Sequence, residues 1–348
     1  MQILENIALA PYTTLKVGGP ARYFVEAKSE TDILDALAYA HEHSVEVFVL
    51  GGGSNLVISD AGWPGLVLKI SIVGMEMAGR NSKRVLTAGA GEDWDAIVAY
   101  AVEQNCAGIE CMSGIPGTVG GTPVQNVGAY GQEVADTITS VRVIDTVSGE
   151  VRELSNAECG FTYRTSIFNS SDKGRYIVTR VSYDLTPSGA PRVEYADLKR
   201  YFASATSAPT LPQIRAAVRS IRATKAMLIT PDDPDARSAG SFFKNPIVSS
   251  AEYDRIAALP ACRSEQPPKY PAAAGQVKIS AAWLVERSGF YKGYGDGHVG
   301  ISRKHTLAIV NRGHATAAEI VEFKNKVQEG VLKAFGVSLH PEPVFVGF

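Results

Sequence analysis

The sequence has few cysteines, no excess of positive charge and no long apolar run. Its four cysteines among 348 residues are too few for a disulfide framework, and none lies at zinc-ligand spacing from a histidine. The formal net charge of −2 gives no positive field for a nucleic-acid backbone. No apolar run reaches the roughly 18 residues that cross a bilayer, and no basic stretch leads into an apolar core at the N-terminus. We therefore expect a cytoplasmic protein with reduced thiols, without metal, nucleic-acid partner or membrane insertion.

What is present is the composition of a folded protein. Hydrophobic residues make up 45% and charged residues 20%, which excludes a disordered or fibrous chain. At about 150 residues per domain, the length predicts two or three domains. The 33 glycines are the one excess, and because they cluster they suggest close approach of bare backbone to a ligand.

Helix and strand patterns alternate without a sustained strand–helix–strand rhythm. Ser29 can cap a helix with an apolar stripe, and Val45 to Leu50 is a β-branched run typical of a buried strand. Residues 141–154 resemble a hairpin. A long helix is predicted to begin at Thr316, in capping-box spacing with an acidic residue, and to end before Gly336. This mixture favours an α+β fold over a doubly wound sheet.

Two glycine-rich segments stand about 60 residues apart. The first, 51–55, follows the strand ending at Leu50, and the second covers 113–131. Neither matches G-x-G-x-x-G, and the first leads into more strand rather than a helix. Each segment alone is more often a tight turn in a β-rich domain. Together, flanked by hydroxyl and amide side chains, they favour a pyrophosphate bound by backbone N–H groups.

Six motifs in order carry a resemblance to a known family across essentially the whole chain. The sequence is similar to the UDP-N-acetylenolpyruvoylglucosamine reductase family, in its longer-chain, type I form. The motifs that carry this likeness are Tyr12 to Ala21, Gly51 to Leu56, Ile115 to Gly131, Tyr163 to Phe168, Gly240 to Pro246 and Pro341-Glu342.

The resemblance implies a fold, an activity and partners. The fold would be α+β, with a vanillyl-alcohol-oxidase-type (PCMH-like) FAD-binding domain in two subdomains and a smaller α+β substrate-binding domain. The expected bounds are 1–70 with 336–348, then 71–225, then 226–335. The activity would be reduction of the enolpyruvyl ether of UDP-N-acetylglucosamine by NADPH through FAD, in peptidoglycan precursor synthesis. NADPH and this UDP-sugar would be the partners of a monomeric enzyme.

The resemblance places FAD on the glycine-rich segments. We expect non-covalent attachment, because no histidine lies between His43 and His298. Cys106 and Cys111 are the other conceivable attachment points, and packing is the commoner role of such cysteines. The implied FAD-binding residues are Gly51, Gly52, Gly53, Ser54, Asn55, Leu56, Ser113, Ile115, Pro116, Gly117, Thr118, Gly120, Gly121, Asn126, Gly128, Ala129 and Tyr130.

The implied chemistry needs a cation, an acid and a proton donor. Hydride delivered to the β carbon of an unsaturated carboxylate pushes charge onto the carboxylate, which requires preorganised positive or hydrogen-bonding groups. The resemblance gives the cation to Arg164 and the acid to Glu342, and it makes Ser241 the proton donor to the α carbon. Outside their motifs, the same residues would be read as a surface ion pair, a solvated carboxylate and an ordinary turn serine.

The UDP group requires its own binding residues. By resemblance, Tyr195 lies on a mobile loop that covers the nucleotide, and lysines provide point charges for its phosphates. Two other functions remain open: an oxidase of the same FAD fold, and a non-catalytic flavoprotein that binds UDP-sugars. The implied substrate-binding residues are Tyr163, Tyr195, Lys225, Asn245, Tyr270 and Lys278.

Overall fold

The computed structural model describes residues 1–80, 82–230 and 232–348, and it divides the chain into two compact units, each with its own hydrophobic core. The chain passes repeatedly from one unit to the other. The three-part division expected from the sequence stays a prediction. Unit 1 comprises Met1–Ile7, Ala21–Gly53 and Trp63–Leu228, and unit 2 comprises Ala8–Pro20, Ser54–Gly62 and Ile229–Phe348.

Unit 1 begins with a four-stranded sheet in the order β1-β2-β5-β3, in which β5 pairs in parallel with both β2 and β3. The predicted helix at Ser29 is confirmed as α1, whose cap is the Ser29 side chain accepting from the Asp32 N–H. Ile33 and Ala36 are fully buried in the core of this unit. The bounds are β1 Leu4–Ala8, β2 Pro20–Ala27, α1 Glu30–Glu42, β3 Val47–Leu50 and β5 Trp63–Ile70.

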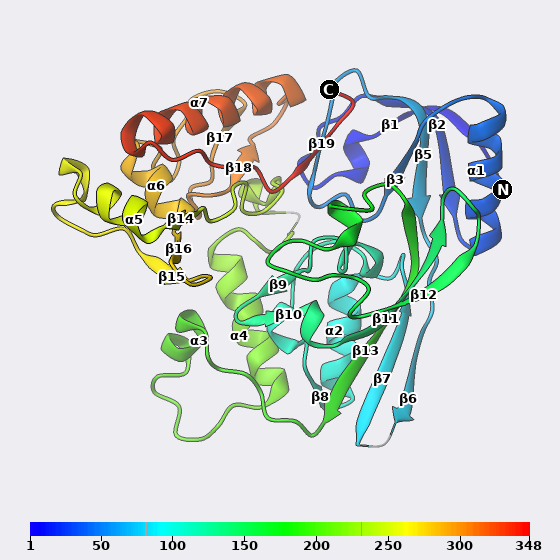
Figure 1. Ribbon diagram of the computed structural model, residues 1–348, viewed down its shortest axis with the longest axis horizontal. Helices are drawn as coiled ribbons and strands as arrows, with labels where there is room; N and C mark the ends of the chain where they lie inside the picture. The colour runs from blue at the N-terminus through cyan, green and yellow to red at the C-terminus, as the bar shows by residue number, and fades with distance from the viewer. Residues whose placement is uncertain (81, 231) are drawn as a thin grey trace. The chain divides into compact units, whose positions relative to one another are not determined.

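A larger antiparallel sheet of unit 1 follows the order β12-β11-β13-β7-β6, and β8 also pairs with β13. The predicted hairpin is confirmed by the pairing of β11 with β12. Helices α2 and α4 pack against each other beside this sheet (Figure 1). The bounds are β6 Met75–Arg80, β7 Lys83–Gly89, α2 Trp94–Glu103, β8 Cys106–Ala107, β9 Gly128–Ala129, β10 Gln132–Glu133, β11 Ile138–Asp145, β12 Val151–Ser155, β13 Tyr176–Pro187, α3 Ala196–Tyr201 and α4 Leu211–Thr224.

Unit 2 combines short strand pairs with helices. The predicted capping box is confirmed: Thr316 accepts from the Glu319 N–H, and α7 ends at Gly336 in the left-handed region with φ 70°. Helix α7 packs on α6, β17 and β18 (Figure 1). These mixed elements confirm the α+β class. The bounds are β4 Leu56–Ile58, β14 Ile247–Ser249, α5 Ser250–Ala257, β15 Lys269–Pro271, β16 Gln276–Ile279, α6 Ala281–Arg287, β17 Val299–Ile301, β18 Ile309–Asn311, α7 Ala317–Phe335 and β19 Val344–Val346.

Segments from the start of the chain complete unit 2. Strand β4 pairs in parallel with β19, so residues 56–58 and 344–346 form one small sheet. The Asp60 carboxylate accepts from the N–H groups of Ala317 and Ala318, at 2.8 and 2.9 Å, and so caps α7 from far along the sequence. Leu15 and Val57 are buried in the core of this unit.

Candidate functional site: glycine segments and a serine–histidine pair

The two glycine-rich segments touch within unit 1. A Cβ added at Gly52 would lie 2.6 Å from the Gly117 Cα, and one added at Gly51 would lie 3.1 Å from the Thr118 Oγ1. Backbone therefore packs directly on backbone, which only glycine permits here. This contact brings the N–H-rich turns of both segments into one surface, the arrangement that a dinucleotide pyrophosphate needs.

The second segment is anchored by backbone hydrogen bonds to the neighbourhood of α2. Gly117 accepts from the Trp94 N–H at 3.1 Å, and the Gly120 N–H donates to the Ala90 carbonyl at 2.8 Å. The Trp94 indole N–H donates to the Met112 carbonyl at 3.1 Å. The segment is consequently a fixed part of the core rather than a loose loop.

Charged side chains of α2 and α4 grip Gly114 at the start of this segment. The Asp95 carboxylate accepts from the Gly114 N–H at 2.6 Å and from Arg215 at 2.5 Å, while Arg222 Nε donates to the Gly114 carbonyl at 3.0 Å. Burial alone would raise the pKa of Asp95, but the hydrogen bonds from Arg215 and Gly114 hold this pKa below its ordinary value. The backbone of Gly114 is thus fixed at both its N–H and its carbonyl.

Thr118 provides a test of whether FAD fits this surface. Its Oγ1 is buried and has no hydrogen-bond partner among the described residues, although such atoms are normally satisfied. Ser113 and Asn126, by contrast, use their side chains internally, on the Glu110 carbonyl and on Glu133. An unsatisfied hydroxyl beside packed glycines fits a phosphate acceptor there.

Arg164 lies against the second glycine-rich segment. Its guanidinium donates to the carbonyls of Asn126 at 3.3 Å and Gly128 at 2.7 Å. Its own backbone is left-handed, with φ 55°, and the Asn169 amide fixes its carbonyl at 3.2 Å. The left-handed conformation costs a non-glycine residue about 1–2 kcal/mol of conformational free energy. Backbone strain of this kind is often found at functional sites. Asn126 and Tyr130 share this left-handed conformation.

Tyr130 gathers two of the predicted substrate-binding residues in unit 1. Its ring meets that of Tyr195 edge-on at 5.3 Å, and Lys225 Nζ lies 6.0 Å from its centroid. Burial raises the pKa of Tyr130 to about 12, so its phenol stays protonated. Lys225 Nζ also donates to Asp197 at 2.6 Å. Sequence reasoning missed Asp197, whose charge balances the lysine.

In unit 2 the segment of Ser241 lies beside that of Glu342. The Glu342 N–H donates to the Phe242 carbonyl at 2.9 Å, and the Asn55 amide donates to the Glu342 carbonyl at 3.1 Å. Ser241 is half-buried, and its Oγ lies 3.2 Å from the Nε2 of His305. Sequence reasoning missed His305, because only the fold brings it to the serine.

The remaining predicted substrate-binding residues share one small sheet of unit 2. Tyr270 on β15 is the register partner of Lys278 on β16. Asn245 precedes β14 of the same sheet, and its Oδ1 accepts from the Ala281 N–H at 2.9 Å. Unit 1 thus holds Arg164, Tyr163, Tyr130, Tyr195 and Lys225, whereas unit 2 holds Ser54, Asn55, Leu56, Ser241, Asn245, Tyr270, Lys278 and Glu342.

The thiols are unsuited to redox or nucleophilic chemistry. All four cysteines are buried, and burial raises the pKa of Cys111 and of Cys159 to about 12. Within the described ranges, no group of three histidine, cysteine or acidic side chains is arranged for a metal ion. Nor does that part of the chain contain a helix both long and apolar enough to span a membrane.

Comparison with known proteins gives matches in both halves of the chain and over its full length. Residues 21–155 match the FAD binding domain family, and residues 232–346 match the C-terminal domain of UDP-N-acetylenolpyruvoylglucosamine reductase. The reductase of that name from Thermobifida fusca is 45% identical over 99% of this chain and 98% of its own length. That from Streptomyces coelicolor is 44% identical over 100% and 91%. The solved reductase from Thermus caldophilus aligns over 99% of both chains, with a TM-score of 0.69 and 26% identity.

Proposed function

Because the chain belongs to the UDP-N-acetylenolpyruvoylglucosamine reductase family, we propose that it reduces the enolpyruvyl ether of UDP-N-acetylglucosamine to UDP-N-acetylmuramate with NADPH. The family matches confirm the resemblance to this reductase family, the FAD-binding α+β fold and FAD as the cofactor. The observation that carries the proposal is 45% sequence identity over 99% of the chain, combined with the close packing of Gly52 on Gly117. We further propose a monomeric cytoplasmic enzyme of peptidoglycan precursor synthesis.

Bound FAD supplies a two-electron carrier between NADPH and the ether. Its pyrophosphate is proposed to lie on the backbone N–H groups of the two glycine-rich segments, with the Thr118 hydroxyl as an additional donor. The packing of Gly52 on Gly117 and the unsatisfied Thr118 Oγ1 support this placement. Attachment is proposed to be non-covalent.

Three side chains are proposed to act on the enolpyruvyl group. Arg164 offsets the negative charge that grows on the substrate carboxylate, and its bonds to Asn126 and Gly128 hold it in place beforehand. Glu342 hydrogen-bonds to the same developing charge. Ser241 donates the proton that the α carbon gains.

The UDP group is proposed to bind lysine, tyrosine and asparagine side chains. Lys225 supplies charge to the diphosphate, exchanging its Asp197 partner for phosphate, and Tyr195 covers the nucleotide. Tyr270 and Lys278 are register partners in one sheet, and Asn245 precedes a strand of that sheet, which supports a common role for them.

Absorption spectroscopy of the purified protein tests this function. We expect a flavin spectrum that bleaches with NADPH under anaerobic conditions and returns when the enolpyruvyl ether is added. Arg164→Lys, Ser241→Ala and Glu342→Gln should each slow the return on the order of 100-fold or more. Rapid reoxidation by oxygen without ether would indicate an oxidase instead. Nucleotide binding without NADPH consumption would indicate a non-catalytic flavoprotein.

A further inference from the structure

A loop of unit 2 presents His305 to Ser241. The Ser241 Oγ and the His305 Nε2 lie 3.2 Å apart, within hydrogen-bond distance. The Phe242 N–H donates to the Leu307 carbonyl at 2.8 Å, so a backbone hydrogen bond one residue after Ser241 and two residues after His305 holds the two segments side by side. The serine–histidine distance therefore follows from the fold rather than from two flexible side chains.

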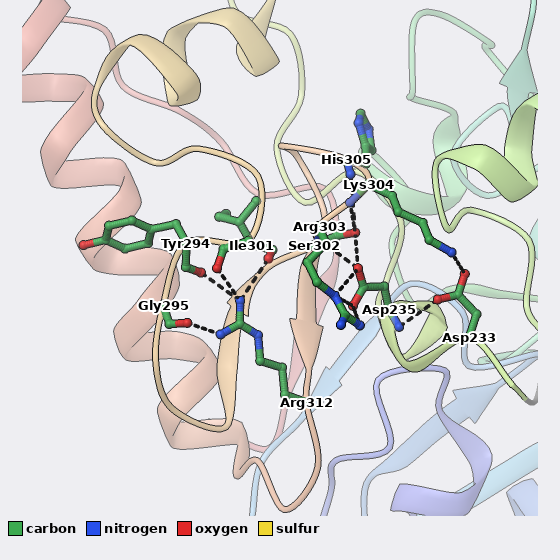
Figure 2. Close-up of polar contacts among 11 residues, drawn as sticks. Asp233, Asp235, Tyr294, Gly295, Ile301, Ser302, Arg303, Lys304, His305 and Arg312 are labelled. Carbon is green, nitrogen blue, oxygen red and sulfur yellow. Dashed lines mark hydrogen bonds and ion pairs between the residues drawn. The ribbon is translucent and has the colours of Figure 1, made fainter.

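Asp235 fixes the loop that carries His305 through hydrogen bonds to Ser302 and Arg303. Its carboxylate accepts from the Ser302 hydroxyl at 3.1 Å and from the N–H of Arg303 at 2.8 Å, and it also binds the Arg303 guanidinium (Figure 2). The His305 N–H in turn donates to the Ser302 Oγ at 3.3 Å. Asp235 and Ser302 are almost completely buried, so the orientation of the loop is well defined.

The charged residues that precede His305 in the sequence are paired with aspartates. On its own loop, Arg303 binds Asp235 and Lys304 binds Asp233, at 2.8 and 2.7 Å. From α6, Glu286 accepts from the Thr306 hydroxyl at 3.5 Å. Both aspartates that contact this loop are thus paired with cations of the loop.

We propose that His305 returns a proton to Ser241, and so acts as a positioning and relay residue for the reduction. This inference rests on the proposed function. The α carbon takes the hydroxyl proton of Ser241 as the β carbon gains hydride, so the π pair becomes a C–H bond. The serine oxygen then takes the Nε2 proton of an imidazolium, leaving neutral His305, which regains a proton from water. A serine hydroxyl is too weak an acid to do this well alone, whereas an imidazolium has a pKa of about 6.5 in its ordinary form.

The kinetic test compares wild type with His305→Gln, which keeps a hydrogen-bonding side chain but cannot ionise. Enzyme reduced anaerobically with NADPH is mixed with the ether across a pH series. In wild type the reoxidation rate should fall about tenfold per pH unit above the pKa of His305. In the variant it should be on the order of 10- to 100-fold slower at neutral pH and independent of pH over that range. Equal rates and equal pH profiles would overturn the proposal.

A structural readout keeps the test independent of turnover. The ring nitrogens of His305 are titrated by ¹⁵N NMR in wild type and in Ser241→Ala. We expect the serine substitution to shift the Nε2 resonance and the titration midpoint, and an unchanged titration would contradict the pairing. His298→Gln serves as the matched control, since His298 is an exposed histidine of the same unit whose Nδ1 lies 3.3 Å from the Glu319 carboxylate. If wild type fails to react with the ether while the Ser241-dependent shift is present, the proposed function fails but the pairing stands.

Discussion

At the scale of single residues, Asp235 shows how a buried carboxylate can organise a loop. Its carboxylate is 3% exposed and takes hydrogen bonds from Ser302 and from the backbone and side chain of Arg303. Burial alone would raise the pKa of Asp235, but the hydrogen bonds from Arg303 and Ser302 hold this pKa below its ordinary value. The ionised carboxylate is thus part of the folded state.

Replacing Asp235 by asparagine should lower stability in a pH-dependent way. We expect Asp235→Asn to reduce the free energy of unfolding by about 1–3 kcal/mol at pH 7. Because the folded-state pKa lies below the unfolded value of about 3.9, this stabilisation is complete above that value. It is lost as the pH falls through the folded-state pKa. Thermal unfolding of both proteins from pH 7 downward measures the difference.

A matched control separates this effect from general charge loss. Asp233 pairs with Lys304, whose side chain is 43% exposed, and asparagine can still cap the turn that Asp233 begins. Asp233→Asn should therefore cost less than about 1 kcal/mol. A constant difference between Asp235→Asn and wild type at every pH would contradict the role given to the ionised carboxylate.

At the scale of elements, the paired glycine-rich segments act as one surface. A side chain at Gly52 would meet backbone atoms of Gly117, which cannot rotate away. The loop of Gly117 is in turn hydrogen-bonded to Trp94 at the start of α2 and to Ala90, which follows β7. Any substitution that separates the two segments should therefore disturb the N–H groups of both.

Replacing Gly52 by alanine should weaken FAD binding. We expect Gly52→Ala to raise the dissociation constant at least tenfold, equivalent to about 1.4 kcal/mol, because the segments must move apart. Flavin absorbance relative to protein absorbance, followed by titration of the stripped protein with FAD, measures this. Gly79→Ala, in β6 with open space around the added carbon, is the control. Equal flavin content in Gly52→Ala and Gly79→Ala would refute the shared surface.

Local signals predicted the elements whose causes are local. Helix α7 follows from Thr316 and Glu319 at one end and Gly336 at the other, all within one stretch of sequence. The contact of Ser241 with His305 has no such signal, because it depends on the pairing of Phe242 with Leu307. The short strands β9, β10 and β14 to β16 were not predicted either, since their partners lie across turns with little periodicity.

The family motifs predicted more residues of the candidate site than composition or periodicity did. It named Arg164, Ser241 and Glu342, whose proposed roles await the spectroscopic test. It gave no indication of Asp95 or Arg222, because a side chain that grips the Gly114 backbone leaves no motif of its own. Such supporting contacts join α2 and α4, which are distant in sequence, and they become visible only in the fold.

At the scale of the whole molecule, unit 2 is assembled from three separate stretches of chain. Its core includes Leu15 and Val57, and β19 pairs with β4. The N-terminus of α7 is capped by Asp60 as well as by Thr316. The C-terminal stretch therefore does not contain its own complete fold.

A fragment of residues 229–348 should not fold stably alone. It lacks β4, the buried side chains of Leu15 and Val57, and the Asp60 cap, whose charge-assisted bonds contribute about 1–3 kcal/mol each. We expect poor dispersion in the NMR amide spectrum and no cooperative thermal transition. Co-expression with residues 1–228, which restore the missing segments, is the control. A sharp unfolding transition of the isolated fragment would disprove this dependence.

The pairing of β4 with β19 also bears on how a cell makes the protein. The ribosome completes β4 early, yet its parallel partner appears only when nearly all the sequence has been translated. Through that interval Val57 and its neighbours have no native strand to cover them, and unpaired apolar strands promote aggregation. Nascent chains stalled before residue 344 should therefore associate with chaperones more strongly than released full-length chains do.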